Sequence, residues 1–356
     1  MFAPLCRRLL ALALGACLSA PAFSAPASFG HTASQQARYI ATYFPGRMTG
    51  SPAEMLSADY IRQQLAKMGY HSDIRAFNSR YLYVTQDKHQ IWRKVTGSTV
   101  IAAREGKQPQ EIVVMAHLDT FAPLSDADSA RNLGGLTLQG IDDNALGVGV
   151  MLELAERLKA FPSRYGIRFI ATSGEEQGKL GAKSLLERMT PEQHKNTLLV
   201  INLDNLVVGD RLYFNSGKST PASVRKLTRD RALTIARSKG IPASTNPGLN
   251  GRYPAGTSCC NDAEVFDSAG IPVLSVEATN WSLGNKDGYQ QRAKSRAFPQ
   301  GTSWHDPRLD NAQYLDSALP GRIDRRAREV VAIMLPLVKE LAKEHVAVTA
   351  GKKRGK

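Results

Sequence analysis

Cysteine is scarce in this 356-residue sequence, which contains only four. Cys6 and Cys17 stand near the N-terminus, and the other two, Cys259 and Cys260, are adjacent. So few cysteines in a chain of this length exclude a small disulfide-framed scaffold. The spacing of the last pair also excludes a zinc site of the Cys-x-x-Cys kind. Neighbouring cysteines can pair only through a strained ring, so a disulfide and two free thiols both stay open for this pair.

Long apolar runs are also missing after the N-terminal segment, so we expect no membrane span. No internal repeat is present, which excludes solenoids and propellers. The formal net charge is +14, and four of the positive charges lie in the tail at 351–356. No basic helix is interleaved with aromatic residues, so the sequence predicts no nucleic-acid role. The excess charge instead indicates a solvated basic surface.

The N-terminal segment is typical of a signal peptide. Arg7 and Arg8 form a positive region, and the apolar run at 9–16 is too short to span a bilayer. Small residues then occur at the spacing that signal peptidase requires, so we expect cleavage after Ser24 and a periplasmic mature protein. The alternative is a lipoprotein box, which would anchor Cys17 to a membrane.

Apolar runs of strand length alternate with helical patterns along the rest of the chain. We expect strands at 70–83, 99–102, 111–116, 168–172, 198–203, 212–215 and 272–276, and helices at 32–43, 52–68, 144–159, 179–189, 221–238, 263–269 and 319–341. This alternation predicts an α/β fold with a mostly parallel mixed sheet covered by helices on both faces. No Pro-, Gly- or Ser-rich linker divides the chain, so we expect a signal peptide at 1–24, a single globular domain at 25–345 and a basic flexible tail at 346–356.

Residues that can bind metal ions follow three of the predicted strands. His117 follows the third strand, Glu175 and Glu176 follow the fourth, and Asp204 follows the fifth. Loops at the ends of strands in an α/β sheet are where ligands bind. Adjacent residues point in different directions, so Glu176 can bind metal while Glu175 faces substrate. Each residue alone has an ordinary explanation as a satisfied histidine, a turn or solvated charge, but their joint occurrence favours a metal site.

Two further segments complete this pattern. Asp142 enters a buried helix, where a bridging carboxylate could stand, and His305 lies in a late loop. Imidazole and carboxylate ligands of this kind suit a hydrolytic centre with two metal ions. Asp119 is placed to accept the second ring N–H of His117 and so to fix its tautomer. Zinc fits these donors, and cobalt or manganese would fit them too.

In these segments the chain resembles the two-zinc aminopeptidases of the metallopeptidase-H clan. His-x-Asp, Asp-Asp-Asn before a helix, Glu-Glu, Leu-Asp and a late His occur in the family order. The resemblance covers about residues 32–343 and implies a zinc exopeptidase-like fold with two Zn²⁺ ions per chain. It implies one zinc on His117 and Asp204, the other on Glu176 and His305, and Asp142 as the bridge.

The same resemblance implies that Glu175 is the general base of peptide hydrolysis. It also implies a cis peptide bond between Asp142 and Asp143. The family more often has His-Thr at the late histidine, whereas Asp306-Pro307 follows His305 in this chain.

The segments at 47–50 and 259–262 make the resemblance to one periplasmic member closer. That likeness implies a peptide or protein N-terminus as partner, and removal of an N-terminal Arg from alkaline phosphatase subunits. Recognition of Arg needs a carboxylate, and the candidates are Asp262, Glu264, Glu277 and Asp287. The alternatives are a glutaminyl-cyclase-like transferase with one zinc, a carboxypeptidase, or a non-catalytic binding domain, which would lack ligands. The sequence does not indicate an oligomeric state.

Overall fold

The structure, a computed structural model, describes residues 27–251, 253–283 and 290–343. The predicted signal peptide at 1–24, including Cys17, and the predicted tail at 346–356 lie outside these residues. Among the residues described, no helix combines the length and the apolar character needed to cross a membrane.

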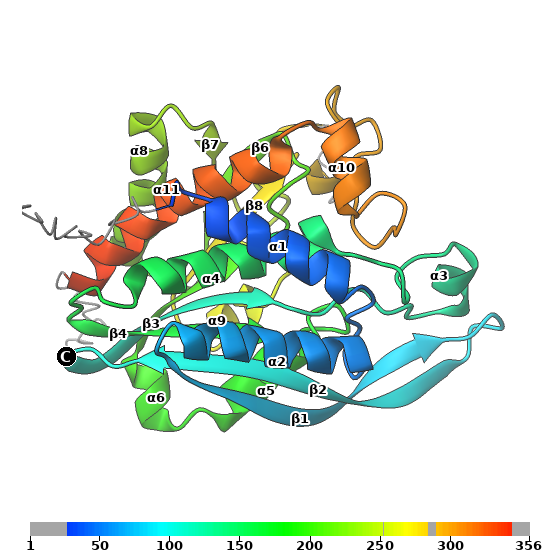
Figure 1. Ribbon diagram of the computed structural model, residues 1–356, viewed down its shortest axis with the longest axis horizontal. Helices are drawn as coiled ribbons and strands as arrows, with labels where there is room; N and C mark the ends of the chain where they lie inside the picture. Colours follow the sequence, from blue (N-terminus) through cyan, green and yellow to red (C-terminus); the bar gives the residue numbers. More distant parts are fainter. Residues whose placement is uncertain (1–26, 252, 284–289, 344–356) are drawn as a thin grey trace, which may run out of the picture.

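One eight-stranded mixed sheet forms the centre of the fold (Figure 1). Its strands are β1 (His71–Val84), β2 (Gln90–Arg104), β3 (Gln108–His117), β4 (Tyr165–Thr172), β5 (Thr197–Leu203), β6 (Arg211–Ser216), β7 (Ala243–Ser244) and β8 (Val273–Thr279). They lie in the order β1-β2-β4-β3-β5-β8-β6-β7. The four central strands β4, β3, β5 and β8 are parallel, and the antiparallel pairs lie toward the edges. The predicted α/β class with a mostly parallel mixed sheet is confirmed.

Helices cover both faces of this sheet. They are α1 (His31–Tyr43), α2 (Pro52–Lys67), α3 (Asp126–Ala130), α4 (Leu146–Leu158), α5 (Leu180–Arg188), α6 (Pro191–Asn196), α7 (Ala222–Arg225), α8 (Arg231–Ser238), α9 (Ala263–Ser268), α10 (Ala312–Ala318) and α11 (Arg322–Lys343). The helices α1, α2, α4, α8 and α11 share the larger apolar core with one face, and α5 and α9 share a smaller core with the other. Figure 1 shows α1, α4 and α11 stacked together on one side.

Strand β3 explains why both faces are covered. Ile112, Val114 and Ala116 belong to the larger core, while Val113 and Met115 belong to the smaller one. Side chains of a strand alternate between the two faces, so an apolar run without polar interruptions buries both. The run ends at His117, and the polar chemistry of the site begins there.

The structure differs from the sequence-based prediction in several local elements. The strand predicted at 99–102 is only the end of β2, and the short helices α3, α6 and α10 were not predicted. Ser51 caps α2 by accepting a hydrogen bond from the Glu54 backbone N–H at 3.1 Å. Glu54 does not complete a capping box with Ser51, because its buried carboxylate accepts instead from the backbone of Ser98 at 2.7 Å.

Helices α1 and α4 pack closely because α4 contains Gly149. A Cβ placed on Gly149 would lie 2.2 Å from the carbonyl oxygen of Ala33 in α1. The absence of a side chain therefore sets the distance between the two helices. Gly149 is therefore a packing residue at the contact between α1 and α4.

We expect Gly149→Ala to lower the free energy of unfolding by about 1–3 kcal/mol, because the added methyl group overpacks the contact with α1. The higher helix propensity of alanine offsets only part of this loss. Urea denaturation measures the change. Gly251→Ala is the control, since a Cβ at Gly251 meets no atom of the described residues within 4 Å. An unchanged midpoint for Gly149→Ala would contradict the packing interpretation.

Candidate metal centre

The functional side chains meet at the carboxyl edge of the central parallel strands. His117 is the last residue of β3, and Glu175 and Glu176 follow the end of β4. Asp204 directly follows β5. Since β4, β3 and β5 are consecutive neighbours in the sheet, these residues lie side by side although they are far apart in sequence. This agrees with the prediction made from their positions after strands.

The first group of potential ligands contains His117, Asp143 and Asp204. The Nε2 atom of His117 lies 3.1 Å from Oδ1 of Asp143 and 3.2 Å from Oδ1 of Asp204. The ligand atoms of all three residues lie within 4.8 Å of one another, and the side chains are buried. One metal ion could be bound by this set.

The second group contains Asp143, Glu176 and His305, again with all ligand atoms within 4.8 Å. The Nε2 atom of His305 lies 3.1 Å from Oε2 of Glu176 and 3.8 Å from Oδ2 of Asp143. Asp143 therefore turns one oxygen toward each group. A carboxylate in this position can bridge two cations.

This geometry corrects the prediction that Asp142 is the bridge. Oδ1 of Asp142 accepts a hydrogen bond from the backbone of Val207 at 2.7 Å. Oδ2 accepts from Ser303 Oγ at 2.9 Å and from Trp304 Nε1 at 3.2 Å. Both carboxylate oxygens of Asp142 therefore accept hydrogen bonds from residues outside the two groups. Asp142 instead positions the loop that carries His305.

Asp143, rather than Asp142, lies between the two groups because the segment before α4 is an irregular turn, Ile141–Ala145. The cis peptide bond joins Asp143 to Asn144, whereas the sequence predicts it one position earlier. The buried Asp310 carboxylate accepts hydrogen bonds from the backbone of Asp142 at 2.8 Å and of Asp143 at 3.1 Å. Sequence reasoning missed Asp310, since an acidic residue in a loop carries no signal of this contact.

Arg47 fixes the other side of this turn. Its buried guanidinium donates to the carbonyl oxygens of Leu118 at 2.9 Å, Gln139 at 2.8 Å and Gly140 at 3.3 Å. Burial lowers the pKa of Arg47 to about 10, although neighbouring carboxylates oppose the shift. The guanidinium thus ties the loop after His117 to the turn that carries Asp143.

Asp119 organises two of the strand ends. The Nδ1 atom of His117 lies 3.1 Å from the backbone oxygen of Asp119 and 3.6 Å from its carboxylate. Asp119, the predicted acceptor of the ring N–H, is therefore next to His117, but the backbone oxygen of Asp119 is nearer to the ring than its carboxylate is. That carboxylate also accepts hydrogen bonds from the backbone of Glu175 and Glu176, each at 3.3 Å.

The electrostatics of the groups fit divalent cations. Burial and repulsion between neighbouring carboxylates raise the pKa of Glu175 and Glu176 well above the ordinary value, and burial also raises that of Asp204. Burial opposes protonation of His117, but the charge of Asp204 and the hydrogen bonds with Asp119, Asp143 and Asp204 together outweigh it and raise the pKa of His117 well above its usual range. Oε1 of Glu176 is buried and has no hydrogen-bond partner among the residues that the structure describes. Two zinc ions would offset this repulsion and suit these donors.

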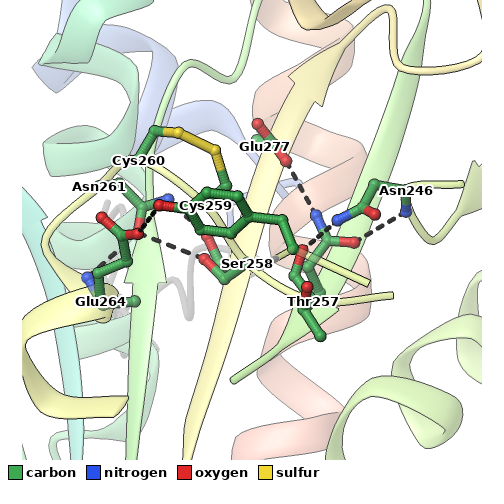
Figure 2. The surroundings of a disulfide bond; sticks show 12 residues. Asn246, Thr257, Ser258, Cys259, Cys260, Asn261, Glu264 and Glu277 are labelled. Atoms are coloured by element: carbon green, nitrogen blue, oxygen red, sulfur yellow. Dashed lines mark hydrogen bonds between the residues drawn. A yellow bond between two sulfur atoms is a disulfide. The ribbon is translucent and has the colours of Figure 1, made fainter. Parts of the chain in front are cut away.

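A cavity of about 140 Å³ is lined by Asp143, Glu175, Glu176, Asp204 and His305. Its lining also includes Glu277 and the pair Cys259–Cys260, which forms a disulfide in this structure. Figure 2 shows Glu277 close to this disulfide. The ring of Phe121 stacks on His305 with centroids 3.9 Å apart, which fixes the orientation of the late histidine.

Comparisons with known proteins agree with this centre. The chain is 71% identical over 343 residues to the alkaline phosphatase isozyme conversion protein of Escherichia coli (strain K12), covering 96% of this chain and 99% of that protein. The zinc aminopeptidase BSAP from Bacillus subtilis has the same fold, with a TM-score of 0.65, 16% identity and coverage of 90% and 96% of the two chains. A glutaminyl cyclase from an Acidobacteriales bacterium also shares it, with a TM-score of 0.59, 17% identity and coverage of 91% and 98%. Residues 99–331 match the model of peptidase family M28. The chain is therefore a member of peptidase family M28, the zinc aminopeptidase family.

Proposed function

We propose that this aminopeptidase acts in the periplasm with two zinc ions that share Asp143 as a bridging ligand. His117 and Asp204 complete one site, and Glu176 and His305 complete the other. The observation that carries the proposal is the pair of ligand groups, each within 4.8 Å, that have Asp143 in common. The presence of two such groups favours a peptidase with two metal ions over a cyclase that uses one zinc ion.

Glu175 is the proposed general base. It lines the same cavity as both groups, yet belongs to neither. When bound, the two ions would polarise the scissile carbonyl and make the attacking water more acidic. Glu175 takes the proton of that water and passes it to the leaving amine. Burial raises the pKa of Glu175, which suits a group that must both accept and donate a proton.

The substrate of the chain is a polypeptide with a free N-terminus. The name of the relative from Escherichia coli refers to conversion of alkaline phosphatase isozymes, and 71% identity over nearly the whole chain supports alkaline phosphatase subunits as the protein substrate. Removal of an N-terminal Arg is the proposed reaction. The signal peptide predicted at 1–24 supports the periplasmic location.

A carboxypeptidase is the competing function, because Arg292 also lines the cavity and could bind a substrate carboxylate. Its guanidinium lies 5.4 Å from the ring centroid of Trp304, next to the histidine of the second group. The two functions differ in which end of the peptide must be free.

We expect about two zinc ions per chain by elemental analysis, and loss of activity on chelation that zinc restores. Acetylation of a peptide's N-terminus should abolish its hydrolysis, whereas amidation of its C-terminus should leave the rate nearly unchanged. Mass spectrometry of the products measures both. Cleavage of the acetylated peptide at its C-terminus would instead indicate a carboxypeptidase.

Glu175→Gln is expected to bind zinc normally and to lose roughly 10²–10⁴-fold in kcat, because the amide cannot accept the proton. Steady-state kinetics and zinc content measure the two effects separately. Glu187→Gln, on the exposed surface of α5, is the matched control. A near-normal rate in Glu175→Gln would show that another group is the base.

Asp143→Asn and Asp142→Asn separate the bridging role from the positioning role. Asp143→Asn should weaken both zinc sites, since it changes a ligand of each. Asp142→Asn should weaken mainly the site with His305, by about 10–100-fold, because it loosens the loop at Ser303 and Trp304. Competition with a zinc chelator measures the two affinities. Loss of both sites in Asp142→Asn with normal binding in Asp143→Asn would reverse the assignment.

A further inference from the structure

Glu277 is a carboxylate that shares the cavity with the metal groups but belongs to neither of them. It lies in β8, the neighbour of β5 in the sheet. Leu203 pairs with Val276, and the backbone N–H of Asp204 donates to the carbonyl of Val276 at 3.0 Å. Glu277 is therefore one strand spacing, about 4.8 Å along the sheet, from the segment that carries Asp204.

Two neutral side chains donate hydrogen bonds to the Glu277 carboxylate. Trp281 Nε1 donates to Oε1 at 2.8 Å, and Asn215 Nδ2 donates to the same oxygen at 2.9 Å. The Asn215 amide is itself oriented, because its oxygen accepts from the backbone of Asn246 at 2.9 Å. Figure 2 follows this network from Glu277 toward Asn246. Both of these hydrogen bonds end on Oε1, so neither of them occupies Oε2.

The Glu277 carboxylate also lacks a cationic partner among the residues that the structure describes. Arg292, which lines the same cavity, lies against the Trp304 ring instead. Burial therefore raises the pKa of Glu277 to about 7. A bound cation would stabilise its ionised form, as an opposite charge does for a buried carboxylate.

The other three carboxylates considered from the sequence do not offer this arrangement. Asp262 accepts a hydrogen bond from Thr172 at 2.6 Å and is buried outside the lining of the cavity. Glu264 forms an ion pair with Lys179. Asp287 lies outside the described residues.

Apolar side chains lie beside Glu277, and a hydrogen bond holds the loop that carries one of them. Cys259, Trp281 and Tyr213 form a small buried cluster next to it. The loop that carries the disulfide is tied to the sheet by the hydrogen bond from the Ser258 backbone to that of Ser216, at 2.7 Å. Such a wall could pack against the aliphatic part of a long basic side chain while Glu277 meets its charged end. The low polarity around the carboxylate would strengthen that pairing.

We propose that Glu277 is the specificity-determining residue of the cavity and binds the cationic side chain, arginine or lysine, of the substrate's N-terminal residue. The inference rests on the proposed aminopeptidase function and specifies its substrate class. The net positive charge of the whole chain does not oppose it, because the described lining of the cavity includes five carboxylates against the single guanidinium of Arg292.

Citrulline, the neutral isostere of arginine, provides the sharpest test. Arg-, citrulline- and Leu-naphthylamide are compared on the zinc-loaded full chain. Wild type should prefer Arg to citrulline, and Glu277→Gln should lower kcat/KM for Arg by about 10- to 100-fold, mostly through KM. Citrulline and Leu turnover should change little. Glu277→Asp, which keeps the charge, should retain part of the preference, and Glu264→Gln should leave the Arg-to-citrulline ratio unchanged.

Calorimetric binding of free L-arginine and L-citrulline gives a readout independent of turnover, and zinc content and thermal unfolding confirm that each variant is folded and loaded. Tighter binding of arginine that disappears in Glu277→Gln supports the inference. An equal loss for all substrates, or an unchanged Arg-to-citrulline ratio in Glu277→Gln, would overturn it even if Leu-naphthylamide is still cleaved. Failure of the zinc-loaded wild type to cleave any of the three substrates would overturn the proposed function itself.

Discussion

The position of the Asp143 carboxylate is the constraint on which the rest of the site depends. One of its oxygens faces His117 and the other faces His305. Several buried carboxylates and two histidines must stay close together, which is unfavourable unless cations compensate them. The fold meets this demand by fixing the backbone around Asp143 rather than by relying on the side chain alone.

Three contacts fix that backbone, and each comes from a different part of the chain. Asp310 accepts from the N–H groups of the turn, Arg47 donates to the carbonyl that precedes it, and Asn144 donates to the end of β5 at 2.8 Å. Asp142, the neighbour of Asp143, connects the same turn to the loop before His305. A shift of one element would therefore move ligands of both groups, so the supporting contacts matter as much as the ligands.

The sequence was sufficient to predict the strands that end at the site and most of the residues that form the two candidate groups. His117, Glu176 and Asp204 are polar residues that directly follow apolar runs, and this change in pattern is visible without coordinates. The choice between Asp142 and Asp143 was not predictable, because the turn is irregular and its direction is set by Asp310 and Arg47. Similarly, four carboxylates were equal candidates for binding a basic side chain, and only the donors and burial around Glu277 distinguish it.

The central claim is that two metal ions share the Asp143 carboxylate. Anomalous diffraction from crystals of the zinc-loaded protein, recorded at the zinc absorption edge, tests it most directly. We predict two peaks about 3.5–4 Å apart, each about 2.0–2.2 Å from one oxygen of Asp143. A single peak, or two peaks that Asp143 does not contact, would contradict the account.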